Sequence, residues 1–334
     1  MHATPPAVTN QSRLARMVNW VQVAREHFVA RLATNAGLRQ HAVAVDDDAG
    51  TVLSFWLPEH KIATTTDQGE KRAARHAVVL VHGFAGDGMM TWGFQVGALA
   101  RCGYDVYVPD LVHFGGSSSP SPDRSVAFQA RCLEAALRKL GVVEGCTVVG
   151  FSYGGFVAFQ MAEAHPGLVR SVVVSGADVA YTGAMNDALL GRFGVGTLAE
   201  LLLPDSARRL RSLFSDAMYK KLWFPQRILN DFLKVMYENR QERKEMLDKL
   251  LMMDKQASST STPSFQQNIL LLWGDDDDFF PVENAKKLKE KLGKKAMLQS
   301  ISKAGHLAQL ERPCVYNRCL KEFLAHVNAI SPQT

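Results

Sequence analysis

A serine flanked by small residues gives the strongest chemical signal in this sequence. Residues 150–155 read GFSYGG, a G-x-S-x-G pattern, and lie between the strand-like run Thr147–Val149 and the helix-prone run Phe156–Ala164. In such a strand-to-helix turn the serine hydroxyl is exposed, and small neighbours prevent steric clashes. The start of a helix also favours negative charge that develops nearby. We therefore predict that Ser152 is a nucleophile.

The hydroxyl of a serine is a weak nucleophile at neutral pH, so a base must lie within hydrogen-bond reach and an acid must orient that base. His306 follows the last expected strand, which would place its imidazole on a loop at the carboxyl edge of a sheet. We predict that His306 is the base. The other histidines lack this position: His82 and His113 are interpreted as structural or pocket-lining residues, and His165 as the end of a helix.

The acid is expected in a run of four aspartates, residues 275–278, that ends another strand. Four carboxylates cannot all be catalytic, and most members of such a run are solvated or cap the helix that begins near Val282. We predict that Asp277, three residues after a glycine, is the catalytic acid. The alternatives are Asp276, Asp278 and, at the end of an earlier strand, Asp178.

An acyl-transfer intermediate carries an oxyanion, which backbone N–H groups usually stabilise. Residues 81–84, VHGF, end the first expected core strand and lead into a loop that contains two glycines. We predict that the backbone amides of Phe84 and Tyr153 form the oxyanion hole. This chemistry requires no metal ion and no organic cofactor.

A scaffold must bring these residues to one edge. From residue 77 onward strand-like and helix-prone runs alternate, which predicts a mostly parallel sheet with helices on both faces. The expected core strands are Ala77–Val81, Tyr104–Val108, Thr147–Val149, Val169–Val174, Ile269–Trp273 and Ala296–Ile301. The expected helices are Gln95–Arg101, Ser125–Leu140 and Phe156–Ala164.

Before this region, two short β-prone runs predict an antiparallel hairpin at the sheet edge. The runs are His41–Val45 and Thr51–Leu57, and residues 46–50 between them have the composition of a turn. A polar stretch, Glu59–Arg75, is interpreted as a loop.

One long stretch interrupts the alternation. Residues 178–264 contain no convincing core strand and are expected to form a helical cap between core segments at residues 40–177 and 265–334. The runs expected in it are helices at Leu198–Leu203, Ala207–Tyr219 and Ile228–Asp254, and a loop at Ser258–Pro263. Six of the chain's twelve methionines lie in the cap. Most of its apolar residues are expected to pack together, and the rest to form an apolar pocket over Ser152.

Residues 1–39 are expected to form an N-terminal extension with an amphipathic, basic helix at Arg13–Leu32. Residues 1–40 hold five arginines and a single acid, Glu26. We favour packing of this helix on the flank of the protein's own core. Peripheral contact with an anionic membrane surface and organelle targeting are the alternatives.

Size and composition predict a soluble, cytoplasmic globular protein with one large core and one insertion. The chain has 334 residues, 47% hydrophobic and 21% charged, with a formal net charge of +5. Outside the first 40 residues the charge is nearly balanced, so nucleic acid is not an expected partner. The five cysteines are scattered, which favours reduced thiols over a zinc site. No signal-peptide core or membrane-spanning run is recognisable.

Together, these motifs resemble the α/β-hydrolase family over nearly all of residues 40–330. The matching pieces are VHGF at 81–84, VPDL at 108–111, GFSYGG at 150–155, Gly274 with Asp277 and Pro281, and Gly305-His306 with Glu311-Arg312-Pro313. The order of nucleophile, acid and histidine is also the family's order. Residues 108–118 and 151–166 look like plant proteins labelled epoxide-hydrolase-like or monoacylglycerol-lipase-like. Epoxide hydrolases of this fold use an aspartate nucleophile, whereas position 152 is serine.

The resemblance implies the α/β-hydrolase fold. The three catalytic candidates predict a serine esterase that acts through an acyl-enzyme on Ser152, and the apolar cap predicts small to medium hydrophobic esters, including aromatic ones, as its substrates. A carbon–carbon bond hydrolase or an acyltransferase would use the same three residues. A small-molecule receptor of this fold would also retain them and would signal through its cap. The small-molecule ester is the partner expected from the chemistry.

Overall fold

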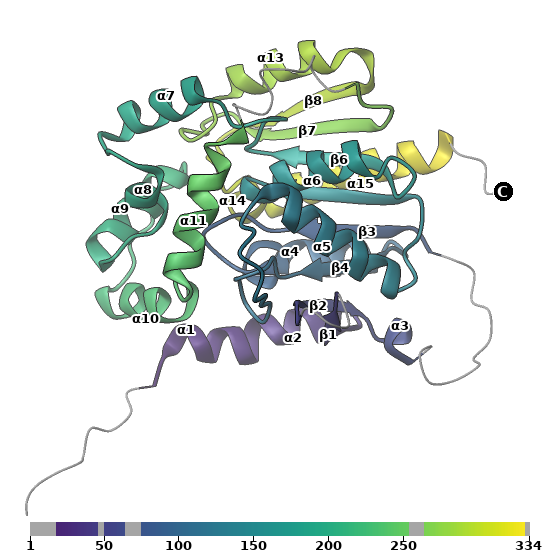
Figure 1. Cartoon of the computed structure of the whole chain (residues 1–334), viewed down its shortest axis with the longest axis horizontal. Helices are drawn as coiled ribbons and strands as arrows, with labels where there is room; N and C mark the ends of the chain where they lie inside the picture. The colour runs from purple at the N-terminus through teal and green to yellow at the C-terminus, as the bar shows by residue number, and fades with distance from the viewer. Residues whose placement is uncertain (1–17, 46–49, 64–74, 254–263, 331–334) are drawn as a thin grey trace, which may run out of the picture.

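The computed structural model describes residues 18–45, 50–63, 75–253 and 264–330. Its centre is an eight-stranded sheet in the order β1-β2-β4-β3-β5-β6-β7-β8 (Figure 1). The strands are β1 (Leu38–Ala44), β2 (Val52–Pro58), β3 (Ala77–Val81), β4 (Asp105–Pro109), β5 (Cys146–Phe151), β6 (Val169–Ser175), β7 (Asn268–Gly274) and β8 (Ala296–Ile301). β2 pairs antiparallel with both β1 and β4, and all other pairs are parallel.

The predicted sheet is confirmed, with small differences at the strand ends. The hairpin forms the antiparallel edge, although its turn at residues 46–49 lies outside the described residues. β5 continues past the predicted run because Gly150 and Phe151 pair with Val174 and Ser175 of β6. The prediction of a loop throughout Glu59–Arg75 is wrong at its start, where Glu59–Ala63 forms helix α3; residues 64–74 are not described.

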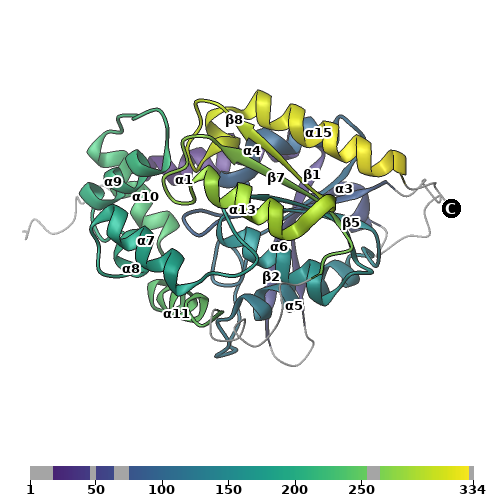
Figure 2. The ribbon, with the colours of Figure 1, turned by 90° about the horizontal axis from the view of Figure 1, so that it is seen from above.

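Helices cover both faces of the sheet (Figure 2). They are α1 (Trp20–Val23), the π-helical turn η1 (Ala24–Val29), α2 (Ala30–Asn35), α4 (Gly88–Ala100), α5 (Val126–Lys139), α6 (Tyr153–Ala164), α7 (Gly183–Phe193), α8 (Leu198–Leu202), α9 (Ala207–Ala217), α10 (Gln226–Met236), α11 (Arg240–Leu250), α13 (Val282–Leu292), the short turn η2 (Gly293–Lys295), α14 (Ala308–Glu311) and α15 (Pro313–Ile330). Within the described residues, none of them is long and apolar enough to cross a membrane.

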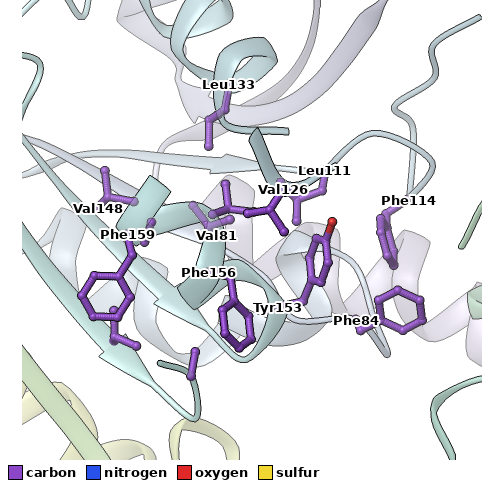
Figure 3. Packing of buried hydrophobic residues seen from close by; sticks show 14 of the residues in the cluster. Val81, Phe84, Leu111, Phe114, Val126, Leu133, Val148, Tyr153, Phe156 and Phe159 are labelled. Atoms are coloured by element: carbon purple, nitrogen blue, oxygen red, sulfur yellow. The ribbon is translucent and has the colours of Figure 1, made fainter. Parts of the chain in front are cut away.

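The core strands are buried on both faces, as parallel strands between helices must be. Along β3, Val79 and Val81 belong to the core that α5 and α6 cover, whereas Val78 and Leu80 belong to the core that α4 and α15 cover. Figure 3 shows part of the first of these cores, to which Phe156 and Tyr153 of α6 belong. Because both faces are packed, the chemistry must lie at the carboxyl ends of the strands.

The insertion between β6 and β7 contains helices α7 to α11 and lies beside the carboxyl ends of the central strands (Figure 1). Several of its helices begin where the sequence supplies a cap: Thr182, Thr197 and Ser206 each accept an N–H from the third residue of the turn. The prediction of one helix over Ile228–Asp254 is wrong, because Asn239 adopts φ 53° and separates α10 from α11. The expected loop Ser258–Pro263 lies outside the described residues.

A buried arginine joins the cap to the core. The guanidinium of Arg243, on α11, lies 4.1 Å from the centroid of the Phe114 ring, and its Nε donates to the carbonyl of His113. Burial lowers the pKa of Arg243 to about 10, so the side chain remains charged at neutral pH. A desolvated cation–π contact contributes about 2 kcal/mol. The contact therefore holds α11 over the loop that follows β4.

The described part of the N-terminal helix packs on the core, as we favoured from the sequence, and also on the cap, which the sequence did not predict. The backbone N–H of Trp20 donates to the carboxylate of Asp231 on α10, and Arg25 forms a 2.8 Å ion pair with Asp87 at the start of α4. The described helix begins at Trp20, so the start of the predicted run at Arg13 lies outside the described residues.

Candidate active site

Ser152 lies in a strained turn between β5 and α6. Its backbone has φ 52° and ψ −121°, a left-handed conformation that costs a non-glycine residue about 1–3 kcal/mol. The turn requires glycine on both sides: a Cβ at Gly150 would lie 2.3 Å from the carbonyl oxygen of Gly154, and one at Gly154 would lie 2.4 Å from that of His82. Close packing of β5, α6 and the loop after β3 thus forces the serine out of the sheet.

His306 and Asp277 form a buried pair. Nδ1 of His306 lies 2.9 Å from Oδ2 of Asp277, and the two side chains are only 8% and 2% exposed. The other carboxylate oxygen, Oδ1, accepts the backbone N–H groups of Phe279 and Phe280 at 2.9 Å each. Both oxygens are therefore engaged, which fixes the direction in which the carboxylate presents Oδ2 to the imidazole.

Aromatic rings and one glycine hold the imidazole in place. Phe279 stacks on His306 with ring centroids 4.9 Å apart, and the Phe151 ring lies 4.8 Å away in a tilted arrangement. Gly176, just after β6, has φ 65°, and a Cβ there would lie 2.5 Å from Cε1 of His306. The absence of a side chain at residue 176 gives the ring its space.

Ser152 and His306 line one cavity of about 520 Å³. The N-terminal helix, α4, α9 and α10 supply most of its wall, and the side chains are almost all apolar. A second cavity, about 30 Å³ in volume, also reaches Ser152 and is lined by Phe84, Tyr153 and apolar residues of the cap. The serine hydroxyl thus stands between a large and a small apolar space.

The peptide between Gly83 and Phe84 is oriented by a buried histidine. Burial lowers the pKa of His82 to about 4, so the ring is neutral and carries a single N–H. Nε2 accepts the N–H of Leu111, which leaves the proton on Nδ1 to donate to the Gly83 carbonyl at 2.7 Å. Because a trans peptide directs its C=O and N–H in opposite directions, the Phe84 N–H points away from this bond.

The Phe84 and Tyr153 amides are placed to receive an oxyanion. Within the described part of the chain neither N–H has a hydrogen-bond partner. The loop approaches the serine closely, since a Cβ at Gly83 would lie 3.2 Å from Cβ of Ser152. The rings of Phe84 and Tyr153 pack edge to face with centroids 5.8 Å apart, as Figure 3 shows, which fixes the two segments relative to each other.

Residues 76–313, which include Ser152, Asp277, His306 and Glu311, match the alpha/beta hydrolase fold family. The chain belongs to that family.

Rat bifunctional epoxide hydrolase 2 is 35% identical over 98 residues, a match that covers 29% of this chain and only 17% of the rat protein. The family's fold is also that of a candidate lipase from Acinetobacter baumannii, at 22% identity and a TM-score of 0.75 over 92% of this chain and 97% of that one. An esterase from Thermogutta terrifontis has 19% identity and a TM-score of 0.64 over 86% and 99% of the two chains.

The competing carboxylates lie elsewhere in this alpha/beta hydrolase. Asp275, Asp276 and Asp278 are exposed or half-exposed, and none bonds to the histidine in the described structure. Their exposure agrees with the expectation that most members of the run are solvated or cap the next helix. None of them is the cap, because the residue before α13 is Pro281 and no side chain caps that helix. Asp178 bonds to the N–H of its own neighbour Val179.

The other candidates are structural. His113 is buried after β4, its carbonyl holds Arg243, and His165 ends α6 as expected. In the described residues no group of three or more His, Cys, Asp and Glu side chains is arranged to hold a metal ion.

Glu311 belongs to the site of this alpha/beta hydrolase, and the sequence did not predict a role for it. Its Oε2 accepts the N–H of Gly305, next to the histidine, at 2.7 Å and that of Tyr219, in the cap, at 3.1 Å. Its Oε1 accepts the N–H of Lys220 at 2.9 Å. One carboxylate therefore ties the histidine loop to the loop between α9 and α10. The sequence showed this residue only as the first of the motif Glu311-Arg312-Pro313. It gave no sign that the carboxylate accepts three N–H groups.

We expect Glu311→Gln to lower kcat about tenfold or more, because an amide offers one acceptor oxygen and leaves N–H groups without a partner at a cost of about 1–3 kcal/mol. The histidine loop would then be less firmly held. The measurement is kcat and KM on a soluble ester at 25 °C, with Tm recorded alongside. Glu283→Gln, on the exposed surface of α13, is the matched control and should behave like the parent. Unchanged kcat in the Glu311 variant would contradict a positioning role.

Proposed function

We propose that this chain is a serine esterase that uses Ser152, His306 and Asp277. The observation that carries the proposal is the strained serine and the buried histidine–aspartate pair on one apolar cavity. Strained backbone conformations of non-glycine residues cluster at active sites, where the surrounding structure holds them in place. Family membership supports a hydrolase of this fold, and the choice among hydrolytic reactions rests on the residues.

The hydrogen bond between His306 and Asp277 supports a mechanism in two halves. Since Nδ1 of His306 is engaged with Asp277, Nε2 is the atom that accepts the proton of Ser152 as Oγ bonds to the ester carbonyl carbon. The carbonyl electrons move to oxygen, where the amides of Phe84 and Tyr153 stabilise them. His306 then gives its proton to the departing alcohol oxygen. Water then gives a proton to His306 and attacks the acyl-enzyme carbonyl. His306 returns the proton to Oγ of Ser152 as the carboxylic acid leaves.

Epoxide opening is not the reaction that these residues favour. The rat relative is named an epoxide hydrolase, but only 17% of that protein is matched. Epoxide hydrolases of this fold attack with an aspartate, and the corresponding turn here carries Ser152. A serine with a paired imidazole suits acyl transfer, in which the alkoxide must be generated in place.

The cavity favours uncharged hydrophobic substrates. Among the side chains that line the 520 Å³ space there is no Asp, Glu, Lys or Arg within the described residues. An unpaired charge carried into such a space loses its hydration without compensation. The volume lies in the range that holds ligands of drug size. The 30 Å³ space beside Ser152 suits a short group on the other side of the ester.

We expect kcat/KM to rise with acyl length through short and medium acyl chains and benzoyl esters, and to be about 100-fold lower or worse for an ester with an anionic acyl group. Desolvation of an unpaired carboxylate costs several kcal/mol, which is the physical reason. A p-nitrophenyl series with acetyl, butyryl, hexanoyl, benzoyl and succinyl groups measures this under multiple turnover. Preference for the succinyl ester or for insoluble triacylglycerol would contradict the proposed substrate class. A single turnover without release would indicate a receptor.

We propose further that the esterase acts in the cytoplasm. Four cysteines, Cys102, Cys146, Cys314 and Cys319, carry free thiols. Free thiols are usual in reducing compartments. Cell fractionation with an antibody against the chain tests this, and recovery in a secreted fraction would contradict it.

A further inference from the structure

Exposed apolar side chains gather around the opening of the 520 Å³ cavity. Trp20, Phe28 and Phe94 line this cavity and are nevertheless 51%, 60% and 48% exposed. Leu222 and Trp223, the latter 76% exposed, lie in the loop between α9 and α10, directly before Phe224 of the cavity wall. Most large hydrophobic side chains that the described residues expose therefore belong to one region of the molecule.

The N-terminal helix and the α9–α10 loop form a continuous surface. Arg227, the second residue of α10, donates from Nη2 to the carbonyl of Val18 at 3.0 Å, and Asn19 donates to the carbonyl of Asp231. Figure 1 shows α1 directly beside α10. We call this surface the rim and define it as residues 18–28, 219–227 and Phe94.

Part of the rim is basic. Between Asp216 and Asp231 the sequence holds three cations, Lys220, Lys221 and Arg227, and no carboxylate. Lys220 and Lys221 precede Leu222 and Trp223 in the loop, and Arg227 follows them at the start of α10. Positive side chains therefore lie on both sides of the apolar pair in the sequence. Exposure of large apolar side chains to water is energetically unfavourable. A contiguous apolar patch on the surface therefore usually marks an interaction site.

We propose that the rim docks onto the surface of a bilayer that contains anionic phospholipid, so that the cavity opens toward the lipid. Tryptophan prefers the boundary between headgroups and acyl chains, and each basic side chain near an anionic surface contributes about 1 kcal/mol. On such a bilayer the apolar rings lie at the headgroup boundary while the cations contact the anionic headgroups. A second copy of the chain fits less well, since a two-fold contact through this face would bring the same cations together.

The role that we give to docking, to take hydrophobic esters from a membrane surface, rests on the proposed function. Binding itself is independent of catalysis. Leu222 and Trp223 do not line the cavity, and the Lys220 and Lys221 side chains are not part of its wall either. Variants at these positions can therefore be compared in binding and in turnover separately.

The test is co-sedimentation of the full chain with vesicles of phosphatidylcholine alone and of phosphatidylcholine mixed with phosphatidylserine. The parent should bind the mixed vesicles and release at high salt. Lys220→Gln/Lys221→Gln should weaken the partition coefficient about 30-fold, as two basic contributions imply. Leu222→Ser/Trp223→Ser should weaken it at least as much.

Matched controls come from other parts of the surface. Val143→Ser alters an exposed apolar side chain near the amino end of β5, and Lys286→Gln/Lys287→Gln lies on the exposed side of α13; both variants should bind vesicles like the parent. All variants should hydrolyse soluble p-nitrophenyl butyrate at the parental rate, because Lys220 contacts Glu311 through its backbone N–H, which the change to glutamine retains. Tryptophan fluorescence should shift to the blue on vesicle addition, less so without Trp223.

Two failures can be told apart. Vesicle binding without any ester hydrolysis would overturn the proposed function and leave docking intact. Hydrolysis of soluble esters without binding to mixed vesicles, or equal binding by the rim variants and the parent, would overturn docking. A stable dimer in light scattering that the Leu222→Ser/Trp223→Ser change dissociates would assign the rim to a second copy instead, and so would also overturn it.

Discussion

Replacing Ser152 with alanine should abolish ester turnover and leave the fold and Tm close to those of the parent. The hydroxyl is the atom that attacks, and loss of a triad nucleophile commonly costs about 10³-fold or more in kcat. Alanine tolerates the φ of 52° as well or as badly as serine, because both carry a Cβ. The stability of the turn should therefore not change much.

The measurement is kcat/KM on p-nitrophenyl butyrate together with thermal unfolding and labelling by a fluorophosphonate. Ser300→Ala, an exposed serine on β8, is the control and should retain both activity and labelling. The Ser152 variant should take up no label. If it kept most of the esterase activity, the reaction would have to run through another nucleophile.

The nucleophile turn and the sheet could be predicted because their signals are local. Alternating runs of Val and Leu with helices between them leave few arrangements other than a parallel sheet. The turn around Ser152 needs its glycines for contacts that lie within a few residues or one strand away, so the motif carries its own geometry. Asp277 could be selected from its neighbours only by distance from a glycine, and the pairing with His306 at 2.9 Å is a geometric fact that the spacing alone did not contain.

What the sequence did not disclose depends on contacts between distant segments. Glu311 acts on a cap loop about ninety residues earlier, and Gly176 matters only because His306 lies beside it. α4 begins at Gly88, seven residues before the predicted helix, because Asp87 accepts the N–H of Met90 at a stretch rich in glycine and methionine. The wall that the N-terminal helix supplies to the cavity likewise follows from packing on α10, not from its amphipathic pattern.

Asp277→Asn should lower kcat about 10⁴-fold with little change in Tm. The reason lies in which oxygen is already held: Oδ1 accepts the N–H groups of Phe279 and Phe280, so an asparagine would keep its oxygen there and turn its NH₂ toward His306. Two donors cannot face each other, so Nδ1 would have to give up its proton and accept. The ring proton would then reside on Nε2, which could no longer take the proton of Ser152.

Asp275→Asn and Asp276→Asn are the matched controls, since both side chains are exposed and the imidazole bonds to Asp277. They should change kcat by less than about threefold, as surface substitutions away from a site usually do. The comparison uses kcat on a soluble ester and Tm for all three variants. Equal losses in the three would show that the run acts as a structural unit and would remove the ground for singling out Asp277. A loss confined to Asp277→Asn, with an unchanged Tm, would tie the effect to the tautomer of His306, because the two N–H bonds that hold residue 277 in place survive the change.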